Sequence, residues 1–118
     1  MLVLCYPKCT TCQKAVRYLQ EKGVSFETRN IKDQNPTAEE LAAWHQKSGQ
    51  KLQKFFNTSG LQYRALELKN KLPRMTEEEM LALLATDGML VKRPLLILED
   101  RVLVGFKPEE WEKALEKK

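Results

Sequence analysis

The sequence has little of what membrane and secreted proteins need. None of its 118 residues lies in an apolar stretch near the roughly 18–20 residues that a membrane-spanning helix requires. The first residues lack the basic start and the cleavage site of a signal peptide. Cysteine occurs only three times, always within the first 12 residues, which excludes a secreted disulfide scaffold. We therefore expect a cytoplasmic protein without a membrane contact.

A block of charge of one sign is also missing. Twenty Lys and Arg against 16 Asp and Glu give a net charge of +4, and the two signs are interspersed along the chain. The most basic segment, residues 64–74, is interrupted by Glu67, so a solvated surface explains it better than a nucleic-acid site. At 118 residues the chain fits one domain, residues 1–118, and we expect a monomer without bound nucleic acid.

The first third predicts a strand, a helix and a second strand. Residues 2–6 form a short apolar run, and a helical pattern follows Pro7 until Gly23. Residues 24–31 alternate loosely between apolar and polar side chains, which favours a strand. Two such strands joined by a helix predict a parallel β-α-β unit.

The middle of the chain, approximately residues 36–86, is predicted to be helical. Thr37 with Glu40, and Thr76 with Glu79, have the spacing of capping boxes, which open helices. Residues 51–56 predict a further short helix.

The last third predicts a hairpin followed by a helix. Residues 95–98 and 102–104 are apolar strands, and Pro108 favours the first turn of a final helix. The order is β-α-β, helices, β-β-α. It predicts an α/β thioredoxin-like fold, in which helices flank a four-stranded mixed sheet and a helical region is inserted between strands 2 and 3.

Two cysteines mark the junction of the first strand and the first helix. Cys9 is expected at the helix start, where free backbone N–H groups and the nearby cation Lys8 stabilise a thiolate. Cys12 lies three positions later, so its sulfur falls on the same helical face and can reach Cys9. This spacing predicts Cys9 as the attacking, low-pKa thiol and Cys12 as the resolving thiol of a dithiol–disulfide pair.

Other readings of the cysteines are open. A structural zinc site requires four ligands, and only Cys5 and His45 are available in addition. A pair of cysteines spaced in this way without any function is a second alternative. Cys5 lies within the predicted first strand and reads as an inert buried thiol. We expect no bound metal or organic cofactor.

Four segments together resemble the arsenate-reductase-like (ArsC/Spx) family of thioredoxin-fold proteins. They are residues 6–15, 55–60, 87–94 and 102–106, and the resemblance covers essentially the whole chain. The uncharacterised CxxC-containing branch of the family is the most similar. The resemblance implies a thiol-disulfide oxidoreductase whose electrons come from an external thiol reductant, either glutathione with glutaredoxin or thioredoxin.

The resemblance also implies contacts for a substrate oxyanion or for a redox switch. In the arsenate reductases the attacking cysteine, matched by Cys9, is surrounded by arginines, and Arg93 before Pro94 matches one of them. Our alignment places Gln53 and Lys107 at the other two arginine positions, so we expect poor arsenate reduction. Pro94 is expected to follow a cis peptide bond beside the dithiol, because only X-Pro bonds make the cis form inexpensive.

An alternative from a different class is a redox-sensing regulator. The Spx-type members of the family carry the same cysteine pair and an arginine that matches Arg93. Their redox state controls binding to the α-subunit of RNA polymerase, which is therefore a candidate partner beside a thiol-redox protein or a low-molecular-weight thiol. The longer C-terminal tail of these regulators is not expected here, because the sequence ends at Lys118.

Overall fold

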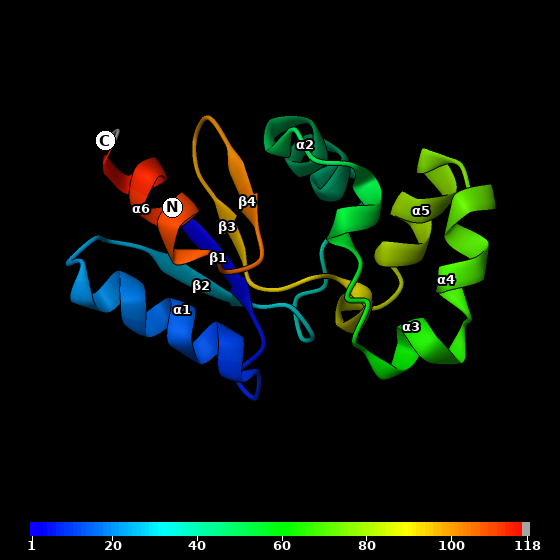
Figure 1. Ribbon diagram of the computed structural model, residues 1–118, viewed down its shortest axis with the longest axis horizontal. Helices are drawn as coiled ribbons and strands as arrows, with labels where there is room; N and C mark the ends of the chain where they lie inside the picture. Colours follow the sequence, from blue (N-terminus) through cyan, green and yellow to red (C-terminus); the bar gives the residue numbers. More distant parts are fainter. Residues whose placement is uncertain (117–118) are drawn as a thin grey trace.

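The computed structural model describes residues 1–116 and contains a four-stranded mixed sheet with helices on both faces (Figure 1). The strands lie in the order β2-β1-β3-β4, in which β1 is parallel to β2, whereas β3 is antiparallel to both β1 and β4. The thioredoxin-like fold predicted from the order of elements is confirmed. The strands are β1 (Leu2–Cys5), β2 (Glu27–Asn30), β3 (Leu95–Ile97) and β4 (Val102–Val104).

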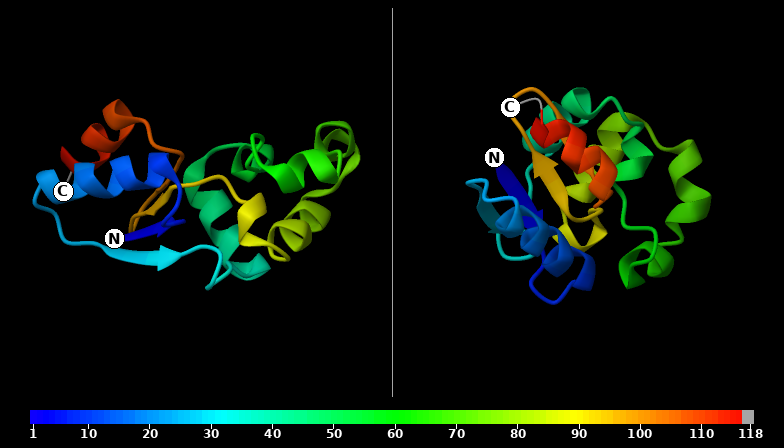
Figure 2. Two further views of the ribbon diagram at one scale, coloured as in Figure 1. Left: turned by 90° about the horizontal axis from the view of Figure 1, so that it is seen from below. Right: turned by 60° about the vertical axis from the view of Figure 1, so that its left-hand side comes forward.

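The helices form two groups. Those that flank the strands are α1 (Thr10–Glu21) and α6 (Pro108–Glu116). The segment between β2 and β3 contains α2 (Ala38–Ser48), η1 (Leu52–Phe55), α3 (Leu61–Ala65), α4 (Leu68–Lys71), η2 (Leu72–Arg74), α5 (Glu77–Leu84) and η3 (Gly88–Leu90), where η marks a 3-10 helix. Figure 2 shows that α3, α4 and α5 lie beyond one end of the sheet, away from α1 and α6.

Both predicted capping boxes are present. The Thr37 hydroxyl accepts a hydrogen bond from the Glu40 N–H, and the Glu40 carboxylate accepts one from the Thr37 N–H, each at 3.1 Å. Thr76 and Glu79 make the same reciprocal pair at the start of α5. These bonds satisfy backbone donors that a helix leaves free in its first turn.

Strand β2 is shorter than the predicted residues 24–31. It pairs with β1 from Leu2 opposite Glu27 to Cys5 opposite Asn30, so the four residues of β1 limit the ladder. Beyond this register the alternating residues at 24–26 have no strand beside them to extend the ladder.

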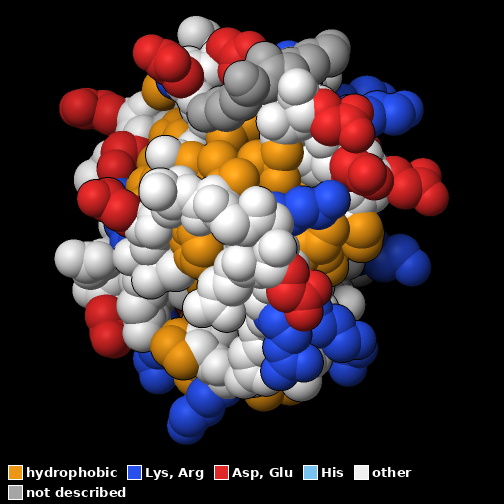
Figure 3. Space-filling model, turned by 90° about the vertical axis from the view of Figure 1, so that its left-hand side faces the viewer, with side chains coloured by type: hydrophobic (Ala, Val, Ile, Leu, Met, Phe, Trp, Pro, Cys, Tyr) orange, Lys and Arg blue, Asp and Glu red, His pale blue; other side chains and the backbone are white. Residues whose placement is uncertain are grey.

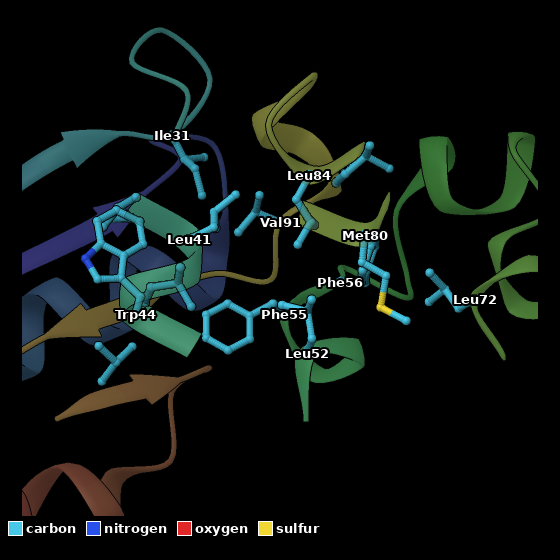
Figure 4. Close-up of a cluster of buried hydrophobic side chains, with 14 of the residues drawn as sticks. Ile31, Leu41, Trp44, Leu52, Phe55, Phe56, Leu72, Met80, Leu84 and Val91 are labelled. Carbon is cyan, nitrogen blue, oxygen red and sulfur yellow. The ribbon is translucent and has the colours of Figure 1, made fainter. Parts of the chain in front are cut away.

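Side chains of β1 alternate between two hydrophobic clusters, one on each face of the sheet. Leu4 belongs to the α2–α5 cluster, whose side chains meet in Figure 4. This cluster contains Leu4, Ile31, Leu41, Trp44, Leu52, Phe55, Phe56, Leu68, Leu72, Met80, Leu84, Leu90, Val91, Leu95 and Val102. The α1–α6 cluster contains Val3, Cys5, Cys12, Ala15, Leu19, Leu96, Leu98, Trp111 and Ala114.

The surface carries the mixture of charges that the sequence predicts. Acidic and basic side chains are both present on the end of the molecule shown in Figure 3, with hydrophobic side chains visible between them. Within residues 1–116, none of the helices combines the length and the apolar character needed to span a membrane.

Candidate redox site

Cys9 occupies the N-cap position of α1, as the sequence predicts. A turn before the helix is closed by the Cys9 N–H, which donates to the Tyr6 carbonyl at 2.9 Å. The Cys9 carbonyl in turn accepts from the Gln13 N–H at 3.0 Å, which is the first bond of the helix. The Cys9 side chain makes no capping hydrogen bond and is half-buried, so its thiol is available to solvent.

Cys12 lies in the first turn of the same helix but is almost fully buried, with 1% of its surface exposed. Its sulfur accepts a hydrogen bond from the Tyr6 backbone N–H at 3.4 Å. Both cysteines are free thiols in this structure. One thiol is therefore accessible, while its partner is shielded beneath it.

The contacts around Cys12 stabilise its thiolate. The largest effect on the pKa of Cys12 comes from a hydrogen bond with the Cys5 side chain, which lowers it, while burial raises it. The Tyr6 N–H, the Cys9 side chain and the charge of Arg93 lower it further. Together they lower the pKa of Cys12 to about 6. The same contact with Cys12, together with burial, strongly raises the pKa of Cys5.

The sequence predicted the activated thiolate at Cys9, whereas the hydrogen bonds that lower a thiol pKa converge on Cys12. The reason is the backbone turn that precedes α1. It directs the Tyr6 N–H at the Cys12 sulfur, and β1 ends with the Cys5 thiol beside that sulfur. Neither contact could be read from the spacing of the two cysteines.

Cys9 opens into a cavity of about 680 Å³ between the two groups of helices. This volume is in the range of small-molecule sites. Residues from four segments enclose the cavity. They are Cys9 and Thr11 of the helix start, Asn57 and residues 59–62 around the start of α3, Met89 with Lys92 and Arg93 before β3, and residues 104–107 at the end of β4 and just after it.

The cavity is rich in positive charge. Lys92, Arg93 and Lys107 line it, and no carboxylate is among its described lining residues. Arg93 precedes the predicted cis peptide bond with Pro94, which is confirmed. Its guanidinium lies over the Tyr6 ring, 5.5 Å from the centroid, and two of its buried nitrogens, Nε and Nη1, have no hydrogen-bond partner among the described residues. Two buried, unpaired guanidinium nitrogens favour an anionic ligand, since burial without a partner is costly.

Of the other residues singled out in the sequence, some line the Cys9 cavity and others do not. Lys107 reaches the cavity, although its exposed ammonium also pairs with Glu110 at 3.4 Å. Lys8 is exposed and does not line the cavity. Gln53 is exposed on η1 and does not line the Cys9 cavity; it lines an adjoining hollow that shares Lys92, Val104 and Lys107 with that cavity.

Asn57 lines the Cys9 cavity, and sequence reasoning missed it. The segment after η1 pairs with the segment before β3: the Asn57 N–H donates to the Leu90 carbonyl, and the Lys92 N–H donates to the Phe55 carbonyl, each at 2.7 Å. This pairing holds Asn57 and Lys92 at the cavity. The Asn-Thr-Ser-Gly turn at residues 57–60 was the available signal, because such a turn projects polar side chains from the end of a helix.

The alternatives that involve His45 and a metal find no support in the geometry. The His45 ring packs edge-on against Phe55 and its Nδ1 lies 3.7 Å from Glu77, within the helical region. Over residues 1–116, no group of three or more His, Cys, Asp or Glu side chains is arranged to hold a metal ion.

Comparisons with known proteins agree with this geometry. The chain is 61% identical to an ArsC family related protein from Bacteroides fragilis, whose crystal structure superposes with a TM-score of 0.93 over 95% of this chain and 94% of that one. It is 53% identical to the uncharacterized protein YusI of Bacillus subtilis, over 91% of each chain. It is 31% identical to the global transcriptional regulator Spx of Enterococcus faecalis, over 88% of this chain and 77% of the regulator. The ArsC family model matches residues 4–114, and the chain belongs to the ArsC family.

Proposed function

We propose that the protein is a thiol–disulfide oxidoreductase in which Cys9 attacks the substrate and Cys12 resolves the intermediate. The observation that carries this proposal is the asymmetry of the pair. Cys9 is accessible in a cavity, whereas Cys12 is buried one turn later with its pKa lowered to about 6. A disulfide substrate can therefore reach only the first sulfur, and the second is already a thiolate near pH 7.

The exchange proceeds in two balanced steps. The Cys9 sulfur attacks one sulfur of the substrate disulfide, a mixed disulfide forms, and the other substrate sulfur leaves as a thiolate. The Cys12 thiolate accepts a hydrogen bond from the Cys9 thiol, so it stands where the Cys9 proton can go. Cys12 then passes that proton to the departed substrate thiolate and attacks the Cys9 sulfur, which closes the Cys9–Cys12 disulfide and releases the second substrate sulfur as a thiolate that takes a proton from water. The substrate gains two electrons and the dithiol loses two.

An external thiol must return the pair to the dithiol form. Glutathione with glutaredoxin, or thioredoxin, supplies the two electrons in this proposal, and no bound metal or organic cofactor takes part. The reducing cytoplasm, where such thiols are abundant, is the proposed compartment.

Reduction of insulin disulfides with dithiothreitol as electron donor tests the proposal. We expect Cys9→Ser and Cys12→Ser each to lower the rate by about 100-fold or more, because both steps of the cycle are needed. Gln34→Ala is the control, since this exposed residue lies outside the cavity, and its rate should equal that of the wild type. Full activity of the Cys9→Ser variant would exclude the proposed mechanism.

Arsenate reduction is proposed to be weak. A tetrahedral oxyanion beside the Cys9 sulfur needs preorganised cations, and only Arg93 supplies a buried guanidinium. Asn57 is uncharged and Lys107 lacks the planar fork that holds two oxygens. We expect arsenate-dependent NADPH oxidation, coupled through glutathione and glutaredoxin, to stay near the level of Cys9→Ser. Robust turnover that depends on Cys9 would overturn this expectation.

A second candidate function is redox-dependent control of transcription, which is favoured by the 31% identity to the regulator Spx. In this case the Cys9–Cys12 pair acts as a switch and its partner is the RNA polymerase α-subunit. Capture of the purified α-subunit by the oxidised protein, but not by Cys9→Ser under the same conditions, would support a regulator. Equal capture by both, or none by either, would exclude it.

A further inference from the structure

Cys5 is buried in the core, as the sequence predicts, and it lies in the same cluster as Cys12. It ends β1, and the alternation of side chains along the strand turns Cys5 and Val3 to the face that α1 covers. Cys5 and Cys12 belong to the same buried cluster, and both line a shallow hollow beside α1, separate from the Cys9 cavity. Cys12 therefore shares the core with Cys5, while Cys9 of the same helix start lines the cavity.

The three cysteine sulfurs differ in the hydrogen bonds and the neighbouring charges around them. Of the three sulfurs, only that of Cys12 accepts a backbone hydrogen bond, from the Tyr6 N–H, and its side chain shares a buried cluster with that of Cys5. The charge of Arg93 acts on Cys12 as well. A second negative charge beside Cys12 would be repelled in this buried place, so Cys5 keeps its proton and is the donor of the shared hydrogen bond.

We propose that Cys5 is a positioning residue whose thiol donates a hydrogen bond to Cys12 and thereby sets how readily Cys12 forms a thiolate. This first part depends only on the contact. A second part rests on the proposed function: a hydrogen bond to the thiolate stabilises the reduced pair alone, because the sulfurs of a disulfide carry no charge. Cys5 then makes the Cys9–Cys12 disulfide easier to reduce, and it exchanges no bond itself.

The test follows the titration of Cys12 by NMR, with ¹³C-labelled cysteine β-carbons, in variants of the full chain. Cys5→Ala and Cys5→Val both remove the thiol donor. Alanine is smaller than cysteine and valine is larger, so an effect that comes from packing alone should differ between the two variants. Cys5→Ser retains a donor at the same place. Val3→Ala is the matched control, since it removes volume from the same strand and the same face but no donor.

We expect the pKa of Cys12 to rise by about one unit in Cys5→Ala and Cys5→Val, and to change by only a few tenths in Cys5→Ser and Val3→Ala. An unchanged midpoint in both donor-free variants would overturn the proposal. A shift in Cys5→Ser as large as in Cys5→Ala would also overturn it, and so would peptide mapping that finds Cys5 in the main disulfide.

The second part is measured as the equilibrium of the Cys9–Cys12 disulfide with glutathione. We expect the constant for reduction to fall about tenfold in Cys5→Val, which corresponds to about 30 mV, and to recover in Cys5→Ser. The titration needs no redox activity. A shifted titration in a protein that forms no Cys9–Cys12 disulfide would therefore count against the proposed function alone, whereas a normal disulfide with an unshifted titration would count against Cys5 alone.

Discussion

The two hydrophobic clusters on opposite faces of the sheet differ in size and in chemistry. The α2–α5 cluster is the larger and contains only hydrocarbon, aromatic and methionine side chains. The α1–α6 cluster is smaller and holds Cys5 and Cys12, with Cys9 packed against its edge. One face of the sheet therefore holds a core without thiols, while the other combines a core with all three cysteines of the chain.

The Cys9 cavity lies where these two regions meet. Cys9 comes from the side of the α1–α6 cluster, whereas Asn57, Leu61 and Met89 come from the helical region. Leu61 is 83% exposed at this rim, which is unusual for a large apolar side chain. The smaller cluster thus surrounds the cysteines, and the inserted helices supply one wall of the cavity into which Cys9 opens.

The two tryptophans test the comparison most strongly, since one lies in each cluster. Trp111 is fully buried and its Nε1 donates to the Gly105 carbonyl at 3.1 Å, whereas Trp44 is 7% exposed. We expect Trp111→Ala to lower the free energy of unfolding by about 3–5 kcal/mol and Trp44→Ala to lower it by less. Urea unfolding measures both. A larger loss of unfolding free energy for Trp44→Ala than for Trp111→Ala would contradict this expectation.

Arg93 tests the charge of the cavity. We expect Arg93→Met to slow exchange with the anionic oxidised glutathione by about 10- to 100-fold relative to exchange with the neutral hydroxyethyl disulfide. The ratio of the two rates removes any effect of the Arg93 charge on the thiols themselves. Lys54→Met, which removes an exposed cation outside this cavity, is the control. Equal slowing with both substrates would contradict an anion-binding role.

The pH dependence of stability distinguishes the thiol-bearing cluster from the other. The pKa of Cys12 is lowered from 9.0 to about 6, so its stabilising contribution is complete above pH 9 and is lost as the pH falls through 6. The reduced protein should therefore lose on the order of 1–2 kcal/mol of unfolding free energy from pH 9 to pH 6. The disulfide form has no such thiolate, and an identical pH profile for both forms would disprove this origin.

The smallest expected effect lies in the helical region. Thr76→Ala removes the capping hydrogen bond to the Glu79 N–H and should cost about 1 kcal/mol of stability. The rate of thiol exchange should stay unchanged, because α5 does not line the Cys9 cavity. Thermal unfolding and the exchange assay are measured on the same sample. A change in exchange rate would show that the two regions are coupled.

Local patterns in the sequence predicted most of the fold. Capping boxes such as Thr37 with Glu40 depend on residues three positions apart, so they can be read directly, and the position of Cys9 follows from the same local logic. The contact between Cys5 and Cys12 depends instead on how β1 packs against α1. The arrival of Asn57 at the cavity likewise depends on pairing between η1 and the segment before β3. Such tertiary contacts have no signature in local spacing.

The central claim is that Cys9 attacks and Cys12 resolves. The most direct measurement incubates Cys12→Ser and Cys9→Ser with oxidised glutathione and identifies adducts by intact mass and peptide mapping. We predict a stable mixed disulfide on Cys9 in Cys12→Ser and no comparable adduct on the buried Cys12 in Cys9→Ser. An adduct that accumulates on Cys12, with Cys9 left unmodified, would contradict the assignment of the two thiols.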